Sequence, residues 1–526
     1  MSIFSKVLTR RPQRSKFDLS HDLKTSFKMG ELIPNLVLET IPNGNYSLSA
    51  ENMLRMAPML APIMHKVNMD TQFFFVPYRI LWDQWEEFIT GGDENSTILP
   101  PTIGGINTIN IGSVGNYMGI PVTGAPIATN SINILPAAAY AKIYDEYYRD
   151  QNLQEEIFQG GLMSGTNVAN LWVKTLMEGN PLKRAWQHDY FTSCLPDAQR
   201  GDEVTLPLLN NDVAKVELNQ DTGLPMEVRN SGSNNLIGTN QKLETTGGGL
   251  PGRLKVDQTS ENVVIDPNGR LDVNINAEAS TINTLRRAFQ VQKWLEKSMR
   301  SGSRYKEMLL SFFGANAGDA RLDRPEFIGS LNHNVAVSEV LSTAQTVGSS
   351  DQVTNVVGQQ SGHGISVGGG STFNYTAKEH GVIIGIQSVR PKTAYYQGLN
   401  RMWTRKDKFD YAWPEFANIG EQEVKVSEIF ADTDSAAEWD ETFGYIPRYS
   451  EYKFQPDRVT GEMQQNLSFW HLGRLFLDKP TLNEDFIQCD PSERIFAALV
   501  DDDHLYLHSY FKIHAVLPLP KYGIPM

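Results

Sequence analysis

The segment LYLHSYFKIHAVL, residues 505–517, indicates the fold class more clearly than any other part of the chain. Apolar and polar side chains alternate along it, which is typical of a β-strand with one buried face and one face in solvent. The apolar positions are Leu505, Leu507, Phe511, Ile513, Ala515 and Leu517, and the polar ones are Tyr506, His508, Tyr510, Lys512 and His514. Further strands, rich in aromatic or β-branched residues, are predicted at 70–76, 382–389, 444–453 and 467–476.

Helices are expected to be few. Amphipathic stretches predict them at 79–90, 136–150, 282–300 and 304–313. In the last of these, Tyr305, Leu309 and Phe312 are expected to be buried. Strands and helices do not alternate along the chain, which argues against a parallel doubly wound sheet. The helices are therefore expected within loops that connect strands of a mainly β protein.

Composition narrows the class of protein further. The chain has 526 residues, of which 40% are hydrophobic, and this excludes a mostly disordered chain. Its apolar runs fall far short of the roughly 18 residues that a membrane span needs, so no membrane partner is expected. The first 19 residues lack the apolar stretch of a secretory signal, and folding in a cytoplasm is expected.

Cysteine and histidine spacing predicts neither disulfides nor a metal site. Cys194 and Cys489 are too few for a disulfide framework or a thiolate zinc site. His504, His508 and His514 lie on the predicted strand, where steps of four and six residues span roughly 13 and 20 Å. Ligands at about 2.1 Å cannot close those distances around one ion. We therefore expect no metal and no cofactor.

The sequence has no catalytic or cofactor-binding motif in the structural context that such a motif requires. Gly247, Gly249 and Gly252 match the dinucleotide pattern, but no buried strand precedes them, Pro251 interrupts them and no helix is predicted to follow. The run 501–503 of three aspartates is typical of a solvated turn. The chain is therefore expected not to be an enzyme.

A segment without aromatic residues interrupts the chain. From Thr192 to Ala288 there is no Phe, Trp or Tyr in 97 residues, so this stretch cannot anchor a large core. Strands are predicted at 262–265 and 270–275, around the turn sequence Asp-Pro-Asn-Gly at 266–269. The segment is interpreted as an outward insertion with small hairpins, and a disordered linker remains the alternative. A second aromatic-free stretch, 328–372, predicts a long surface loop or extended arm.

Charge is distributed unevenly. The net charge of the chain is -14, yet residues 1–30 carry seven Lys or Arg against two Asp. The cations that precede the first acid are Lys6, Arg10, Arg11, Arg14 and Lys16. A terminal block of like charge is typical of nucleic-acid binding, but also of an inert solubilising tail. From charge alone both readings stay open.

Ten blocks in order resemble the major capsid protein of small single-stranded DNA phages, the microviruses, and in particular their gokushovirus branch. The first five are FDLSHDLKTSFKMGELIP from Phe17, FFFVPYRILWDQWEEFITGG from Phe73, HDYFTSCLP from His188, GSRYKEMLLSFFG from Gly302 and DARLDRPEFIG from Asp319. The others are EHGVIIGIQSVRP from Glu379, YYQGLNRMWTRKDKFDYAWPEFANIGEQEV from Tyr395, FGYIPRYSEYKF from Phe443, LSFWHLG from Leu467 and the terminal PKYGIPM. Asp197-Ala198 departs from the Trp-Pro that the family tends to carry.

The resemblance implies an eight-stranded antiparallel jelly roll of the viral capsid type with long loops, assembled as a T=1 icosahedral shell around circular single-stranded DNA. It divides the chain into a basic arm at 1–30 and a single jelly-roll domain at 31–526, with a surface insertion at 202–280 that forms three-fold protrusions. Expected partners are further copies of the chain, the genome, small basic DNA-binding and pilot proteins of the same virion, and a host receptor. Its location would be the virion, assembled in the host bacterial cytoplasm.

Residues that contact DNA, the host or other copies are predicted from charge and composition, read together with this resemblance. The five cations of the arm are expected to contact DNA phosphates. Host contact is expected at the tip of the insertion, at Asn234, Asn235, Asn240, Pro267, Asn268 and Gly269. Met53, Met56, Met59 and Met64 are interpreted either as a subunit contact or as ordinary core. The alternative function is a jelly-roll carbohydrate-binding adhesin, which would lack the basic arm.

Overall fold

The computed structural model describes residues 12–91, 98–104, 109–122, 132–202, 204, 282–343, 346–347, 353–431, 435–497 and 503–522, and six short strands between 215 and 274. The chain divides into two compact units. The first comprises Met1–Arg200 and Ser298–Met526, and the second comprises Gly201–Lys297. Each is described by itself.

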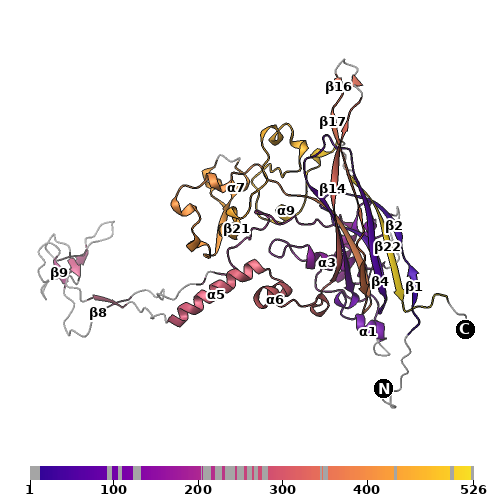
Figure 1. The fold of residues 1–526 in the computed structure, drawn as a ribbon. Coiled ribbons are helices and arrows are strands. Elements are labelled where there is room, and N and C mark those ends of the chain that lie inside the picture. The colour runs from indigo at the N-terminus through magenta and orange to yellow at the C-terminus, as the bar shows by residue number, and fades with distance from the viewer. Residues whose placement is uncertain are drawn as a thin grey trace, which may run out of the picture. The chain divides into compact units, whose positions relative to one another are not determined.

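The first unit is built on two antiparallel layers of strands (Figure 1). One layer contains β1 (Ser15–Asp18) and β2 (His21–Phe27) on β22 (Leu505–Leu517), then β4 (Asn45–Met56), then β17 (Gln360–Gly369) and β18 (Phe373–Thr376). The other layer runs in the order β3 (Ile33–Thr40), β19 (Gly381–Pro391), β5 (Val67–Pro77) and β14 (Glu326–Leu341). The layers form one curled sheet because β14 pairs with β5 through Val335 and with β17 from Ala336.

This connectivity is that of a jelly roll. When the split outer strands β1–β2 and β17–β18 are each counted once, eight strands remain, four in each layer. Successive strands change layer, except that β5 and β14 are neighbours in the same one. Such a double sheet of two Greek keys is the jelly roll that the resemblance implied. The predicted fold class is confirmed.

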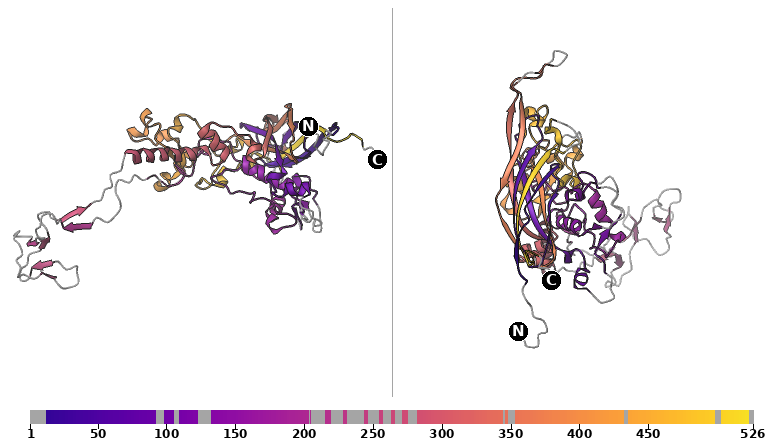
Figure 2. Two further views of the ribbon diagram at one scale, coloured as in Figure 1. Left: turned by 90° about the horizontal axis from the view of Figure 1, so that it is seen from below. Right: turned by 90° about the vertical axis from the view of Figure 1, so that its right-hand side faces the viewer.

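The strands are held by a core between the layers and by a second one outside. Phe73 and Phe75 of β5 point between the layers, where they pack with Phe511 of β22. Phe74, one residue along, points to the opposite face because side chains alternate along a strand, and it packs against α3 (Leu135–Tyr147). The alanine run of α3 is fully buried there, since small side chains let the helix approach the sheet. Figure 2 shows the helices of this region, in purple, on one face of the sheet.

Two long connections carry most of the irregular structure. Between β5 and β14 lie α1 (Trp85–Thr90), β6 (Thr102–Ile103), α2 (Val114–Tyr117), β7 (Ile132–Asn133), α3, α4 (Leu171–Glu178), the second unit, α5 (Ile282–Ser301) and α6 (Tyr305–Phe313). A third and shorter connection joins β14 to β17, and in it β15 (Thr346–Val347) pairs with β16 (Val353–Asn355). Between β19 and β22 lie β20 (Glu421–Lys425), α7 (Val426–Ile429), α8 (Ala436–Trp439), β21 (Thr442–Pro447) and α9 (Glu484–Ile487).

The second unit contains nested antiparallel pairs. Its strands are β8 (Lys215–Leu218), β9 (Val228–Asn230), β10 (Leu243–Thr245), β11 (Leu254–Val256), β12 (Val263–Ile265) and β13 (Leu271–Asn274). β10 pairs with β11, β9 with β12 and β8 with β13. The strands predicted on either side of the turn at 266–269 therefore exist, but they pair with earlier strands and not with each other. Most of α5, from Ile282 to Lys297, also belongs to this unit.

Several predicted elements are confirmed and others are wrong. The strands at 70–76, 382–389 and 505–517 and the helices at 136–150, 282–300 and 304–313 are present. The burial predicted for the last helix is wrong, because Tyr305 is exposed and Leu309 and Phe312 are only half-buried. The helix at 79–90 is shortened to a 3₁₀ turn at Tyr78–Ile80 and α1, and the strand at 444–453 ends at Pro447. The strand at 467–476 is absent. In this segment the Arg494 side chain donates hydrogen bonds to the carbonyl oxygens of Ser468, His471 and Gly473. These carbonyls therefore need no donor from a neighbouring strand.

Candidate assembly and genome-contact surfaces

The basic segment enters the sheet sooner than the arm boundary at residue 30 implies. Lys6, Arg10 and Arg11 lie outside the described residues, but Arg14 donates hydrogen bonds to the carbonyl oxygens of Asn43 at 2.7 Å and Val516 at 3.2 Å. Lys16 lies opposite Val516 in the pairing of β1 with β22. Both side chains are exposed. Two of the five predicted cations are thus fixed at an edge of the sandwich, and the strand β2 that follows belongs to the jelly roll.

The exposed face of β22 carries histidines that have separate partners. His508 Nε2 lies 3.2 Å from Asp22 Oδ1, and His514 Nδ1 lies 3.6 Å from Asp18 Oδ1. Hydrogen bonds from Ser20 lower the pKa of Asp18. Within the ranges that the structure describes, no group of three His, Cys, Asp or Glu is placed to hold a metal ion.

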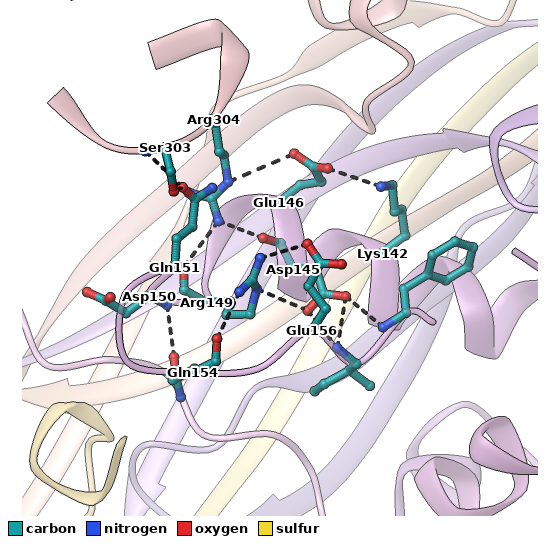
Figure 3. A network of polar contacts seen from close by, with 12 residues as sticks. Lys142, Asp145, Glu146, Arg149, Asp150, Gln151, Gln154, Glu156, Ser303 and Arg304 are labelled. Carbon is teal, nitrogen blue, oxygen red and sulfur yellow. Dashed lines mark hydrogen bonds and ion pairs between the residues drawn. The ribbon is translucent and has the colours of Figure 1, made fainter. Parts of the chain in front are cut away.

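A polar network fixes the point at which the chain returns from the second unit (Figure 3). Arg304, the residue before α6, donates to the carbonyl oxygens of Asp145 at 2.6 Å and Arg149 at 3.1 Å, at the end of α3. The Asp145 carboxylate accepts hydrogen bonds from the backbone N–H groups of Ile157 and Phe158. Burial raises the pKa of Asp145, and these donors oppose the shift. The root of α6 is therefore tied to α3, within the first unit.

A second buried ion cluster lies on β5. Asp70 Oδ2 is 2.6 Å from Arg184 Nη1 and 3.5 Å from Arg390 Nη2, and its other oxygen accepts from Asn332. Arg184 also donates to Ser388 Oγ at 2.7 Å. Burial and the neighbouring Arg184 lower the pKa of Arg390. One carboxylate thus bridges two largely buried guanidinium groups, balances one of their two charges, and attaches the segment at 184 to two strands of the sandwich.

An aromatic surface lies on the connection between β19 and β22, and we call Trp403, Phe409, Tyr411, Trp413 and Tyr452 the aromatic platform. All five side chains are exposed, Trp403 by 70%. The Arg405 guanidinium lies 4.4 Å from the ring centre of Tyr452 and 5.4 Å from that of Tyr411. Trp413 Nε1 donates to the Lys408 carbonyl at 2.8 Å. Tyr411, Trp413 and Tyr452 are thus held in place while all five rings stay exposed, an arrangement typical of protein-contact hot spots.

This platform was missed at the level of sequence. Four of its residues belong to the block that begins at Tyr395 and Tyr452 belongs to the block that begins at Phe443, but the aromatic pattern of a core and that of a contact surface look alike in a sequence. The only signal was the interleaving of aromatic and charged residues in WTRKDKFDYAW. A core strand such as FFFV at 73–76 has no such charges.

The remaining predicted site residues are divided. Met56 and Met59 are buried, which confirms the core interpretation for these two, whereas Met53 is half-buried, Met64 is exposed, and a subunit contact there stays a prediction. The six predicted host-contact residues lie outside the described residues.

Cys194 and Cys489 are free and buried. Burial raises the pKa of both thiols, that of Cys489 to about 12. At neutral pH both are therefore protonated and poorly reactive. Among the helices described, none is long and apolar enough to cross a membrane.

A cleft of about 1000 Å³ opens beside β2 and β3. Charged groups of both signs line it, among them Lys28, Glu31, Glu493, Arg494 and Asp503. Lys28 Nζ lies 3.4 Å from Glu493, and the Lys28 N–H donates to the Glu31 carboxylate at 2.9 Å. Burial, aided by Asp503, raises the pKa of Glu31 to about 7. This carboxyl therefore titrates close to neutral pH.

Comparison with known proteins gives one consistent result. Residues 5–526 match the family described as Capsid protein (F protein). The chain is similar to capsid protein VP1 of Chlamydia phage 1, at 34% identity over 99% of this chain and 97% of the relative. It is also similar to capsid protein VP1 of Bdellovibrio phage phiMH2K (32% identity, 99% and 97% covered) and of Spiroplasma virus 4 (30% identity, 97% and 95% covered).

Proposed function

Since the chain belongs to the F capsid protein family and is the major capsid protein of a microvirus, a structural part of the virion, we propose that its copies form a T=1 icosahedral shell around a circular single-stranded DNA genome. The observation that carries this proposal is the jelly-roll sandwich with two long connections that hold rigid apolar side chains in solvent. Such surfaces supply contacts between copies without any chemical step. Family membership indicates a structural role and favours the capsid over the adhesin alternative.

Electron microscopy of particles purified from infected cells tests the shell. We expect uniform icosahedral particles whose reconstruction shows one chain per asymmetric unit, with a nuclease-resistant single-stranded genome inside. Size-exclusion chromatography should place the protein in the megadalton range or as a small assembly intermediate. Single molecules only, in every buffer and beside the other virion proteins, would refute the proposal.

The basic segment is proposed to contact the genome. Exposed Arg14 and Lys16 at the sheet edge support this proposal because both side chains face solvent, where phosphates can reach their charges. Neutralising about five phosphates of a single strand gives a salt slope near -3.5, and reversing Arg10, Arg11 and Arg14 to Glu should reduce its magnitude by about 2. Binding of an oligonucleotide to unassembled protein across salt concentrations measures this. A control variant reverses the exposed Lys66, Lys453 and Lys521. An unchanged slope together with unchanged DNA packaging would contradict the role.

The second unit is proposed to contact the host receptor. Its separation from the jelly roll as a compact unit with its own nested strand pairs supports this, because such an insertion can change without disturbing the shell domain. Deletion of 210–279 with rejoined ends should leave particles that assemble but do not adsorb to host cells. Loss of assembly would identify the insertion as a clamp between copies. The proposal also includes small basic DNA-binding and pilot proteins as partners inside the virion.

A further inference from the structure

The strands β14 and β17 continue beyond the sandwich as a two-stranded ribbon. β5 pairs with β14 only as far as Val335, and β4 pairs with β17 only from Ile365 onward. Between these limits Ala336–Leu341 of β14 pair with Gln360–Ile365 of β17. The pairing goes on past the strands, because Ser342 N donates to the Gln359 carbonyl at 2.9 Å and Gly358 N to the Ser342 carbonyl at 2.8 Å. Figures 1 and 2 show the ribbon extending from one end of the sheet.

Apolar side chains of this ribbon lie in solvent. Val340, Leu341, Val356 and Val357 are each exposed by 51% to 61%. Within the sandwich, by contrast, Val67 and Val389 are at 0% exposure, although Val367 of β17 is exposed by 71%. An isolated two-stranded ribbon is marginally stable in water, because each strand has a partner on one side only. Beyond Val337, which still packs against the core, this part of β14 thus lacks the packing that stabilises the rest of the strand.

One edge of the ribbon is also open. Gly362 of β17 exchanges backbone hydrogen bonds with Met59 at 3.1 Å, which covers the outer edge of that strand. Within the described part of the chain, no strand pairs with the outer edge of β14 from Ala336 to Leu341. An open edge with apolar side chains is a template on which another chain can add.

The charge of the ribbon identifies the class of partner. Residues 336–343 and 356–364 include one acid, Glu339, one histidine, His363, and no Lys or Arg. A polyanion such as DNA finds no cation here, so the surface suits an uncharged, apolar protein surface. In a shell made of one kind of chain, the protein surface that every copy meets is that of another copy.

We propose that the ribbon, residues 336–343 with 356–364, is a contact arm that docks on a second copy of this chain through its four exposed aliphatic side chains and the open edge of β14. This inference rests on the proposed shell, but not on its T=1 symmetry. It places a contact between copies on the connection between β14 and β17, apart from the aromatic platform.

The reactivity of a single introduced cysteine tests the arm. Val357→Cys adds an exposed thiol to a chain whose two own cysteines are buried and protonated at neutral pH. A maleimide should label this thiol at least tenfold more slowly in assembled particles than in unassembled protein. Wild-type particles give the background, and denatured particles give complete labelling. Equal rates in particles and in unassembled protein would overturn the proposal, while the shell itself would stand.

A pair of substitutions tests the same arm by assembly. Val340→Lys with Leu341→Lys should lower particle yield at least tenfold, while circular dichroism and the unfolding midpoint of the unassembled protein stay unchanged. The conservative pair Val340→Ile with Leu341→Met should assemble like wild type. Normal assembly of the lysine variant with loss of host adsorption would indicate a receptor contact and overturn the arm. Thiol protection that is present in filled particles and absent in empty shells would indicate DNA and overturn it too.

Discussion

β5 and the aromatic platform have similar side chains and opposite surroundings. Phe73, Phe74 and Phe75 are exposed by 1% or less, whereas Trp403 is exposed by 70%. The difference lies in what the backbone does. β5 is paired on both edges and covered on both faces. In the platform, Arg405 stacks on Tyr452 and Trp413 donates to one carbonyl, and the rings remain exposed. The same residue types therefore stabilise the fold of one copy in the first region and are available to neighbours in the second.

The largest expected effect is on the buried side of this comparison. Phe73→Ala should lower the free energy of unfolding of the unassembled protein by about 4 kcal/mol, because the ring leaves a cavity between the layers. Denaturant unfolding followed by circular dichroism measures it. An effect below about 1 kcal/mol would show that the site collapses around the missing ring.

The next effect concerns charge. Asp70→Asn should lower the free energy of unfolding of the unassembled protein by about 3 kcal/mol, since it leaves the largely buried Arg184 and Arg390 without their counter-charge. The matched control is Asp457→Asn, which removes an exposed ion pair with Lys392 and should cost less than about 1 kcal/mol. Equal costs for the two variants would contradict the assignment of the Asp70 cluster as buried and coupled.

A smaller, pH-dependent effect is expected at Glu31. Its pKa in the folded protein, about 7, lies above the ordinary 4.5. The folded state therefore holds a proton that the unfolded chain has lost, and stability falls as pH rises from about 4.5 to 7. Glu31→Gln removes this dependence. As pH rises from about 5 to about 8, the unfolding free energy of the variant should therefore increase by about 2 kcal/mol relative to that of wild type. Parallel stability profiles of the two proteins over that range would contradict the shift.

The smallest effect on stability is expected at the platform. Trp403→Ala should change the unfolding free energy of the unassembled protein by less than about 0.5 kcal/mol, as surface substitutions do. Particle yield should nevertheless fall, because exposed Trp side chains are frequent hot spots of protein contacts. Lys521→Ala, also on the surface, should affect neither quantity. A stability loss comparable to that of Phe73→Ala would place Trp403 in the core.

The sequence predicts best where periodicity and composition agree. β22 has the same bounds as the alternating segment at 505–517, and β5 and β19 are found where aromatic and β-branched runs place them. Residues 328–372, which include most of β14 and all of β17, were interpreted as a loop or arm because they lack aromatic residues. β17 is rich in glycine for a packing reason: a side chain at Gly364 would overlap Met56, and one at Gly368 would overlap the ring of His333. Neighbouring side chains pack so closely on β17 that glycine is needed there, and this gives the strand the glycine-rich composition of a loop.

The candidate surfaces were harder to predict from the sequence than the strands were. Charge alone located the basic segment, but not the strands β1 and β2 that fix its end, because pairing with β22 joins residues about 500 positions apart. The aromatic platform could not be told from a core, since exposure is decided by tertiary packing. The host-contact residues at 234–240 and 267–269 stay a prediction.

β14 is the one strand shared by both layers, and its far end forms the proposed arm. A force applied to that end would travel along a single extended backbone into the middle of the sandwich, with no flexible loop between. Hydrogen bonds of β14 with β5 and with β17 would bear the load in shear, the direction in which a ladder of strands resists separation collectively. In each copy, load on the contact made by the arm would thus pass to the paired strands of the sandwich. A shell made of such copies would resist internal pressure through its backbone hydrogen bonds as well as through its surface contacts.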